Sequence, residues 1–402
     1  MSKLPGYTEL APGPTDSLKP CTSMAAIPPL LNRRVILIAT ASINAQNIFS
    51  NGLFQNIYLI YRLAEAIGWL PIFVVSEKPK CLDDIPKVLH NCRIAGIDDI
   101  VKQPLPASIY LEIGMSVDVN MRRFLKMLGA RICKLYLGNI LNIDIETPLF
   151  YFPMSFLHHS IGEQDEIWVS PHYQQHAQYA AAINQIEPGS KYQRVAPYIW
   201  DPSILLDDGR RQLQWRPKQP NEKQILLIME PNISFQKCSL LPLMAVESFY
   251  QKNPTWDGEV YLVNGEKLIQ TTYFLPSIYQ HLKIVKDNKV KVMGRRDMKD
   301  MMAETPSMIA ICHQVNNDYN YMTLEFMYTG FPLIHNAGAW SEYGYYYPNN
   351  DIDAAAEQIK YALDSHSERV EVYKSHGRAL AWRHSLYNPD VQAAWKTLLE
   401  AP

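Results

Sequence analysis

The stretch Arg34–Ala41, RVILIATA, is a continuous run of mainly apolar side chains. Such a run is typical of a strand that is buried on both faces of a parallel sheet. After it come the turn residues Ser50-Asn51-Gly52 and then Leu53–Ile67, where apolar residues recur at helical spacing. A second buried-strand run, Pro71–Ser76, follows. This order of strand, helix and strand predicts a βαβ unit that opens an α/β domain.

The same alternation continues along the chain and then starts again. Further strands are expected at Ala107–Ile113, Arg131–Leu137, Glu166–Ser170, Gln224–Met229, Glu259–Val263, Lys289–Met293, Ser307–Cys312 and Phe331–His335. Helices are expected at Val119–Leu128, Gln174–Ile186, Leu240–Gln251, Tyr273–His281, Asp297–Ala303, Tyr319–Tyr328, Asp353–Leu363 and, with breaks, Val370–Glu400. The predicted fold class is therefore α/β, with two Rossmann-like domains whose parallel sheets face a central cleft.

Composition shifts set the expected domain bounds. Residues 1–32 hold six prolines and are expected to form an extended arm that wraps the body or stays mobile, with partner binding as the alternative. The N-terminal domain is expected at 33–200, a linker at 201–222 and the C-terminal domain at 223–365. Residues 366–402 are expected to form C-terminal helices, which either stay with the C-terminal domain or cross back to the N-terminal domain.

The composition excludes several classes of protein. Of 402 residues, 38 are basic and 40 acidic, so no chain-wide basic surface for nucleic acid exists. Six cysteines lie far apart and none stands in a zinc-type cluster, which favours buried thiols. No apolar run has the length of a membrane span, and the start lacks a signal-peptide core. We expect a soluble protein of the cytoplasm, or of the host cytoplasm if a virus encodes it.

The common cofactor and hydrolase motifs are absent. No GxGxxG, GxxxxGK[ST], GxSxG or HExxH occurs in the chain, so no cofactor is expected. The single Asp-x-Asp, Asp351-Ile-Asp353, precedes a run of good helix formers, and helix capping explains it better than metal binding. No metal site is therefore predicted.

The most informative segment is Asn316–Asn336, NNDYNYMTLEFMYTGFPLIHN. Glu325 is the one acidic residue of an otherwise apolar helix, and an uncompensated carboxylate that faces a core is costly. Two interpretations stay open: Glu325 accepts hydrogen bonds from a vicinal diol such as a ribose, or it pairs with a neighbouring helix.

The run Thr323–Ile334 resembles the "LEAMA-x-G-x-PVV" segment of GT-B glycosyltransferases, especially the retaining enzymes of glycosyltransferase family four. In that family two glutamates, eight positions apart, contact the donor, and the second binds the nucleotide ribose. Glu325 matches the second glutamate, while the first falls at Asn317, which is not acidic. The resemblance also implies that Lys237 contacts the diphosphate and that the loop Gly294-Arg295 frames the base.

A second resemblance covers roughly residues 33–350. The chain is similar to a family of bacterial and viral proteins that is described only as a domain of unknown function. The shared positions are Asn51-Gly52 with Gln55 and Asn56, Trp200 and Pro202, Glu230-Pro231-Asn232 with Lys237, and the run that ends at Asn336. This resemblance supports the fold and says little about the substrate. We expect donor contacts for Asn232 and Asn336 and cleft positions for Asn51, Gly52, Gln55 and Trp200.

Sugar transfer from a nucleoside diphosphate builds negative charge on the leaving group, so a fixed positive group must stabilise it. The candidates are Lys237, Arg295 and the amino end of the helix that begins near Asn317–Tyr319. Tyr319, Asn320 and Tyr321 at this end are expected donor contacts. The alternatives are that Lys237 is a solvated surface lysine and that Arg295 forms a surface ion pair.

Acceptor groups are expected in the N-terminal domain. Glu112 ends a buried strand, and His158 and His159 lie in a loop beyond the next, so each is a candidate base, although a structural role is the more frequent one. Two basic stretches, one from Arg122 to Lys134 and one from Lys283 to Lys299, either approach an anionic acceptor or are solvated helix faces.

The sequence thus predicts a metal-independent, retaining glycosyltransferase that uses a nucleotide-sugar donor, with a UDP-sugar expected. The acceptor is a glycan, a small molecule or a modified DNA base. A catalytically silent nucleotide- or sugar-binding module of the same fold is the rival interpretation.

Overall fold

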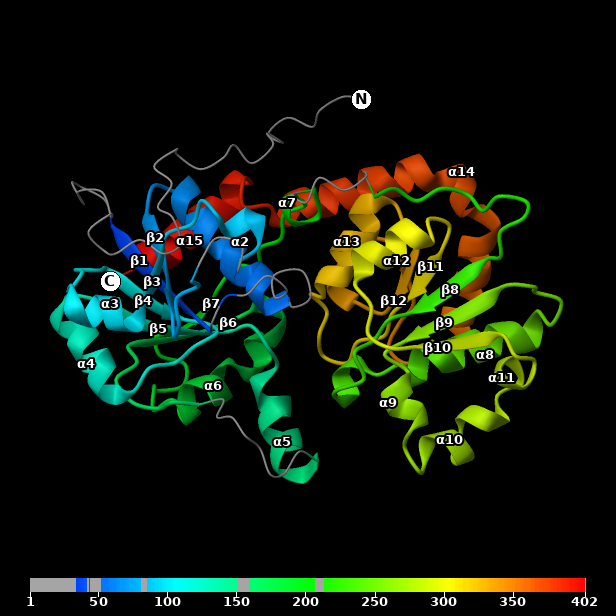
Figure 1. The fold of residues 1–402 in the computed structure, drawn as a ribbon, viewed down its shortest axis with the longest axis horizontal. Helices are drawn as coiled ribbons and strands as arrows, with labels where there is room; N and C mark the ends of the chain where they lie inside the picture. Colours follow the sequence, from blue (N-terminus) through cyan, green and yellow to red (C-terminus); the bar gives the residue numbers. More distant parts are fainter. Residues whose placement is uncertain are drawn as a thin grey trace. The chain divides into compact units, whose positions relative to one another are not determined.

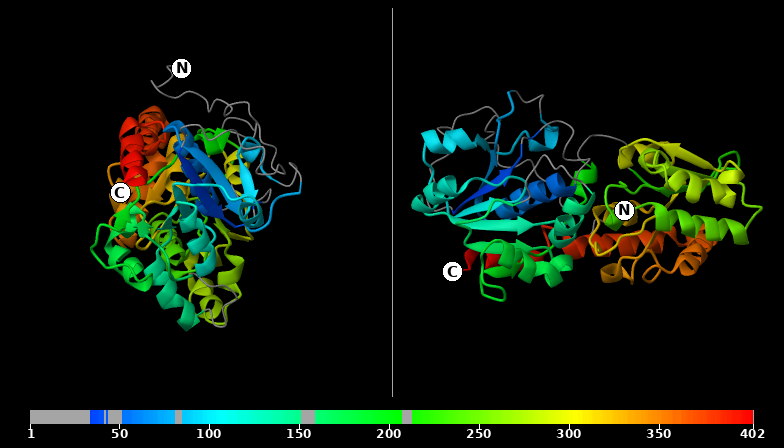
Figure 2. Two further views of the ribbon diagram at one scale, coloured as in Figure 1. Left: turned by 90° about the vertical axis from the view of Figure 1, so that its left-hand side faces the viewer. Right: turned by 90° about the horizontal axis from the view of Figure 1, so that it is seen from below.

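The computed structural model describes residues 34–41, 43, 52–80, 85–150, 159–206 and 213–401. The chain divides into two compact units, and each holds one parallel sheet with helices packed on it (Figures 1 and 2). Unit 1 consists of Met1–Asp208 and Trp382–Pro402, and unit 2 consists of Gly209–Ala381.

The sheet of unit 1 has the strand order β3-β2-β1-β4-β5-β6-β7, and all neighbouring strands are parallel. Its strands are β1 (Val35–Thr40), β2 (Leu70–Val75), β3 (Ile94–Gly96), β4 (Ile109–Glu112), β5 (Arg131–Tyr136), β6 (Glu166–Val169) and β7 (Gln193–Val195). Its helices are α2 (Gly52–Ala66), α3 (Ile97–Lys102), α4 (Val119–Met127), α5 (Ile140–Phe150), α6 (Ala177–Ile183), α7 (Ser203–Leu206) and α15 (Pro389–Glu400).

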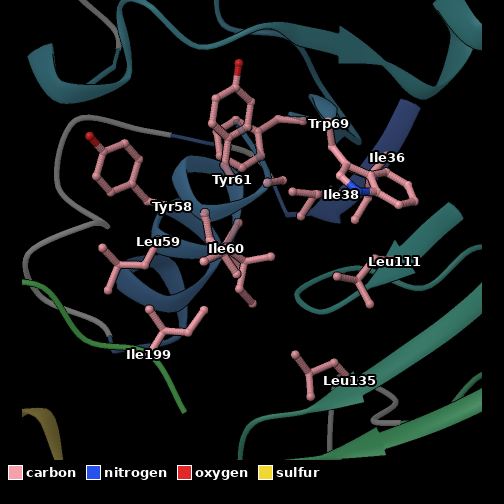
Figure 3. Close-up of a cluster of buried hydrophobic side chains, with 14 of the residues drawn as sticks. Ile36, Ile38, Tyr58, Leu59, Ile60, Tyr61, Trp69, Leu111, Leu135 and Ile199 are labelled. Carbon is pink, nitrogen blue, oxygen red and sulfur yellow. The ribbon is translucent and has the colours of Figure 1, made fainter. Parts of the chain in front are cut away.

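The two faces of this sheet bury two separate cores. Along β1, alternate side chains point to opposite faces, so Ile36 and Ile38 enter one core while Val35 and Leu37 enter the other. The first core also receives side chains of α2 and α15. Figure 3 shows part of this core, including Ile36, Ile38 and Tyr61. The continuous apolar run that opens this domain follows directly from burial on both faces.

The sheet of unit 2 is also parallel, with the order β10-β9-β8-β11-β12-β13. Its strands are β8 (Ile225–Ile228), β9 (Glu259–Val263), β10 (Val290–Met293), β11 (Ile309–Ile311), β12 (Leu333–His335) and β13 (Tyr345–Tyr346). Its helices are α8 (Leu240–Lys252), α9 (Glu266–Ile269), α10 (Phe274–Ser277), α11 (Lys283–Lys286), α12 (Met298–Glu304), α13 (Tyr321–Thr329) and α14 (Ile352–His384), whose last residues, from Trp382, are assigned to unit 1.

The two parallel sheets confirm the predicted fold class. The differences are several short elements, the unpredicted helix α5 and the uninterrupted helix α14. Three strands were not predicted, namely β3, β7 and β13, because two or three residues carry no readable pattern. At the end of unit 2, α14 runs without interruption through the expected break at residues 364–369. The tertiary division therefore falls at Ala381–Trp382, whereas the sequence placed it at residue 365.

One buried ion pair joins β4 to α4 in unit 1. Arg122 donates to both carboxylate oxygens of Glu112, through Nε at 2.9 Å and Nη2 at 2.9 Å, and both side chains are at most 1% exposed. The adjacent Arg123 pairs with Glu163 at 2.9 Å, but its side chain is 62% exposed. Two adjacent arginines of α4 thus belong to a buried ion pair and to an exposed ion pair.

Because one of these two adjacent arginines is buried and the other is exposed, we expect their replacements to lower the free energy of unfolding by very different amounts. Arg122→Ala leaves the Glu112 carboxylate buried without its cation, so we expect the free energy of unfolding to fall by about 3–5 kcal/mol. Arg123→Ala, the control on the same helix turn, is expected to cost at most about 1 kcal/mol. Urea unfolding followed by tryptophan fluorescence measures both, and equal losses would contradict the analysis.

Candidate functional site

Polar residues gather where the strands of the unit 2 sheet end. Because β8, β11, β12 and β13 are parallel neighbours, their carboxyl ends meet at one edge of the sheet. The residues that follow these strands are Glu230, His313-Gln314, Asn336 and Tyr347. Four of these five side chains are buried, Asn336 is half-buried, and hydrogen bonds join the five residues into one network.

Glu230 is the buried charge of this edge, at 1% exposure. Its carboxylate accepts hydrogen bonds from the backbone N–H of His313 at 3.2 Å and from Gln314 Nε2 at 2.7 Å. Burial raises the pKa of Glu230 to about 7, although these hydrogen bonds and the charge of Lys237 lower it in part. The carboxyl group therefore titrates in the neutral range.

Lys237 lies in the loop after β8, at the end of the short 3₁₀ turn Phe235–Lys237, and is half-buried. Burial lowers its pKa, and the Glu230 carboxylate acts in the opposite direction. The structure thus places the predicted diphosphate lysine next to a carboxylate that the sequence analysis did not treat as a site residue.

Asn232 holds the loop that carries Lys237. Its backbone has a left-handed φ of 53°, and its N–H donates to the carbonyl oxygen of Lys237 at 3.0 Å. The side-chain amide donates to Ser239 Oγ at 3.0 Å and to the Asn264 carbonyl oxygen at 3.1 Å, and it accepts from the Ser239 N–H at 2.8 Å. Asn232 therefore orders the loop, and its predicted donor contact stays a prediction.

Gln314 connects Glu230 to two further predicted residues. The side chain of Asn336 accepts from the Gln314 N–H and donates to the Gln314 carbonyl oxygen, both at 2.8 Å. The buried Asn317 donates through Nδ2 to Gln314 Oε1 at 2.5 Å. The structure thus brings Asn317 and Asn336 together, as expected of residues that share one site.

His313 contributes no charge to this network at neutral pH. Burial lowers its pKa to about 4. Its Nδ1 lies 2.8 Å from the hydroxyl of Tyr347, which donates to the Cys312 carbonyl oxygen at 3.1 Å, so Nδ1–H donates to that hydroxyl. The neutral ring is oriented by this pair of hydrogen bonds.

The helix α13 begins at Tyr321, two residues later than predicted. Asn320 has an extended backbone and caps the helix, since its side chain accepts from the Met322 N–H at 3.1 Å. Tyr319 precedes the cap and packs edge-on against Trp340 at a centroid distance of 5.1 Å. Glu325 is 7% exposed on this helix, and Gly330 ends the helix with a φ of 81°.

Gly294 and Arg295 follow β10, which lies two strands away from β8 in the sheet order. The Gly294 carbonyl oxygen accepts from the Asn264 N–H at 3.4 Å, and an added Cβ at Gly294 would lie 3.3 Å from the Glu266 carboxylate. Arg295 is exposed. These two residues share the carboxyl edge of the sheet with Lys237 but lie farther along it.

Of the acceptor candidates in unit 1, Glu112 is engaged with Arg122 through both carboxylate oxygens. His159 Nε2 lies 2.7 Å from Asp144 Oδ2, so it donates to that carboxylate, and Nδ1 lies 3.1 Å from the Tyr136 hydroxyl. Both groups therefore have structural partners, and their roles as bases stay predictions.

The remaining cleft candidates lie on α2 and near the end of the first unit 1 segment. Gly52 is the first residue of α2, and Gln55 is buried on it. Trp200 is 1% exposed, so its ring is part of the core of unit 1. Asn51 and His158 lie outside the described residues.

The aspartate pair before α14 has the structural role that the sequence indicated. Asp351 caps the helix by accepting from the Ala354 N–H at 2.9 Å, and the exposed Asp353 pairs with Lys252 at 2.5 Å. Within the described ranges, no three or more histidine, cysteine, aspartate and glutamate side chains form a group that could hold a metal ion. None of the helices in the described part of the chain combines the length and apolar character of a membrane span.

Sequence reasoning missed Glu230, His313 and Gln314 as site residues. The available signal was their position, since each directly follows an apolar strand run, and such positions meet at the ligand edge of a parallel sheet. In the sequence, Glu230 is identified only as a position shared with the similar family, and no site role is predicted for His313 and Gln314.

No functionally curated protein matches the sequence. Solved structures do match it, at low sequence identity. The lipopolysaccharide outer core galactosyltransferase WaaB has a TM-score of 0.53 at 10% identity, over 91% of this chain and 99% of that chain. The trehalose-6-phosphate synthase OtsA has a TM-score of 0.58 at 12% identity, over 92% and 99%. Anabaena Alr3699/HepE, solved in complex with UDP-glucose, has a TM-score of 0.53 at 10% identity, over 90% and 99%.

These neighbours are GT-B glycosyltransferases, and at such identities the likeness establishes the fold. The GT-B architecture predicted from the sequence is thereby confirmed. A family model described as "Protein of unknown function (DUF2827)" matches residues 36–399. Since that match spans most of the sequence, the chain belongs to the DUF2827 family and has the GT-B fold.

Proposed function

We propose that this protein is a glycosyltransferase whose unit 2 binds a nucleoside-diphosphate sugar and whose unit 1 binds the acceptor. The observation that carries the proposal is the network at the carboxyl edge of unit 2, where hydrogen bonds connect Glu230, Gln314, Asn317 and Asn336, and where the charges of Glu230 and Lys237 act on each other. The bound UDP-glucose of the structural neighbour Anabaena HepE supports a UDP-sugar as the donor.

The proposed chemistry needs a positive group near the leaving diphosphate. Lys237, Arg295 and the amino end of α13 supply it in our proposal, without a metal ion. The first turn of α13 has backbone N–H groups directed at its amino end, and Asn320 satisfies one of them. Retention of the anomeric configuration is proposed from the resemblance to glycosyltransferase family four.

A binding module without transfer activity is the second candidate, and Asn317 favours it. The family pattern has a carboxylate at this position, whereas Asn317 donates to Gln314 and carries no charge. The negative charge of Glu230 beside Lys237 further weakens the positive field that transfer requires. Calorimetry with UDP, UDP-glucose and other nucleotide-sugars, together with donor hydrolysis assays, separates the two, because a module binds a donor without turnover.

The proposed ribose contact gives the first prediction of this function. If Glu325 accepts hydrogen bonds from the ribose diol, Glu325→Gln should weaken UDP binding about tenfold, since charge-assisted hydrogen bonds contribute about 1.5–3 kcal/mol. Glu357→Gln, on an exposed face of α14, is the matched control and should leave the affinity unchanged. Equal affinities of both variants in calorimetry would assign Glu325 a structural role.

Lys237 distinguishes an enzyme from a binding module. Its interaction with the diphosphate grows as charge moves onto the leaving oxygen, so Lys237→Ala should lower kcat by on the order of 10²-fold. Lys237→Arg should recover part of the loss, because a planar fork replaces a compact ammonium. Steady-state kinetics with the donor that is turned over measures both variants. A raised KM with unchanged kcat would limit Lys237 to donor binding.

The same assay tests metal independence when it is run with and without excess chelator. A loss of activity in chelator that manganese restores would contradict a metal-independent reaction.

The raised pKa of Glu230 predicts that donor binding depends on pH. With a pKa of about 7, Glu230 is mostly neutral at pH 6 and mostly anionic at pH 8, where it repels the diphosphate. The dissociation constant for UDP-glucose should therefore rise by about three- to tenfold between pH 6 and pH 8. Glu230→Gln should flatten this profile. Binding that tightens with rising pH would show that the carboxylate does not face the donor.

A further inference from the structure

The basic stretch of unit 1 contains one cation that differs from the rest. Four of its basic side chains have carboxylate partners within 3.3 Å. These pairs are Arg122 with Glu112, Arg123 with Glu163, Lys126 with Glu163 and Asp165, and Arg131 with Glu166. Among the described residues, Lys134 takes part in no such pair and its Nζ has no hydrogen-bond partner.

Lys134 is also deeply buried. The residue is 5% exposed, and its Nζ lies 5.0 Å from the centroid of the Tyr136 ring. Burial lowers the pKa of Lys134 to about 8. The carboxylates of Glu112 and Asp144 act to raise this pKa, whereas the charge of Arg122 lowers it further. A buried ammonium that faces an aromatic ring but has no carboxylate and no hydrogen-bond acceptor is costly, so a protein that keeps one at this depth is expected to use it.

The nearby carboxylates are already engaged. Lys134 aligns with Glu112 in the parallel register of β5 and β4, so both side chains leave the same face of the sheet. Glu112, however, accepts three hydrogen bonds, two from Arg122 and one from the Val117 N–H at 3.3 Å. Asp144 Oδ2 accepts from His159 and from the Tyr179 hydroxyl, each at 2.7 Å. Both negative groups that act on Lys134 thus have other partners.

We propose that Lys134 binds an anionic oxygen, of a carboxylate or a phosphate group, that belongs to the second substrate. An anionic oxygen supplies both a hydrogen-bond acceptor and the missing counter-charge, whereas a neutral hydroxyl supplies only the acceptor. That the anion is part of the acceptor rests on the proposed glycosyltransferase function. Anion binding at Lys134 does not, because it follows from unit 1 alone.

The test compares the wild-type chain with Lys134→Met and with Lys126→Met. Both variants lose one positive charge, but Lys126 is a half-buried lysine that already has carboxylate partners. Inorganic phosphate and glucuronate are titrated by calorimetry at constant ionic strength, with glucose as the neutral probe. We expect at least one anion to bind, Lys134→Met to weaken it at least tenfold, Lys126→Met to change it less than twofold, and glucose not to bind. The anion that binds more tightly indicates whether Lys134 binds a phosphate or a carboxylate group.

Stability provides an independent readout. Removal of an unpaired buried charge should leave the Tm of Lys134→Met equal to or above that of the wild type without anion, and phosphate should no longer raise it. In the wild type, NMR of labelled lysines should show the pKa of Lys134 rising by at least one unit in saturating anion. Equal anion affinity in wild type and Lys134→Met, or an unchanged Lys134 pKa, would overturn the proposal. If no nucleotide-sugar binds but the anion results hold, only the glycosyltransferase function fails.

Discussion

The buried carboxylate of Glu230 organises the carboxyl edge of the unit 2 sheet. It follows β8 and binds the backbone of His313 and the side chain of Gln314, which follow the neighbouring strand β11. Gln314 is in turn bonded to Asn336, which follows β12. One carboxylate thus ties together the loops of three adjacent strands. Because a buried charge must keep its hydrogen bonds, this edge has little freedom to rearrange, and the loop of Lys237 is built against it.

The sequence predicted the central elements of the fold and missed its margins, for a physical reason. Runs such as Ile225–Ile228 and Val35–Thr40 are fully buried and, apart from Thr40, apolar. The edge strand Gln193–Val195, in contrast, is half-exposed and only three residues long, so no pattern distinguishes it from a loop. The capped start of α13 was misplaced by two residues, because Asn320 is preceded by several other residues that are capable of capping.

The site was less predictable than the fold, because its partners are distant in the sequence. The run of basic residues on α4 and β5 suggests a charged face, yet Glu163, Asp165 and Glu166, more than thirty residues along, neutralise most of it. In the second basic stretch, Lys291 pairs with Glu259 and Arg296 pairs with Glu304. An excess of basic residues in a sequence becomes informative only after such ion pairs are taken into account. In the first stretch, Lys134 is the described basic residue that is left without a carboxylate partner.

The departure from the family pattern at Asn317 has a local explanation in the same network. Gln314 donates through Nε2 to the acceptor Glu230, so its Oε1 is directed at Asn317 and needs a donor there. Asn317 supplies that donor through Nδ2. A glutamate at position 317 would offer an ionised carboxylate to Gln314 Oε1 and place two acceptors face to face, close to the carboxylate of Glu230. Glu230 and a glutamate at 317 would thus both present acceptors to Gln314, so the bridge to Glu230 favours an amide donor at position 317, which Asn317 supplies.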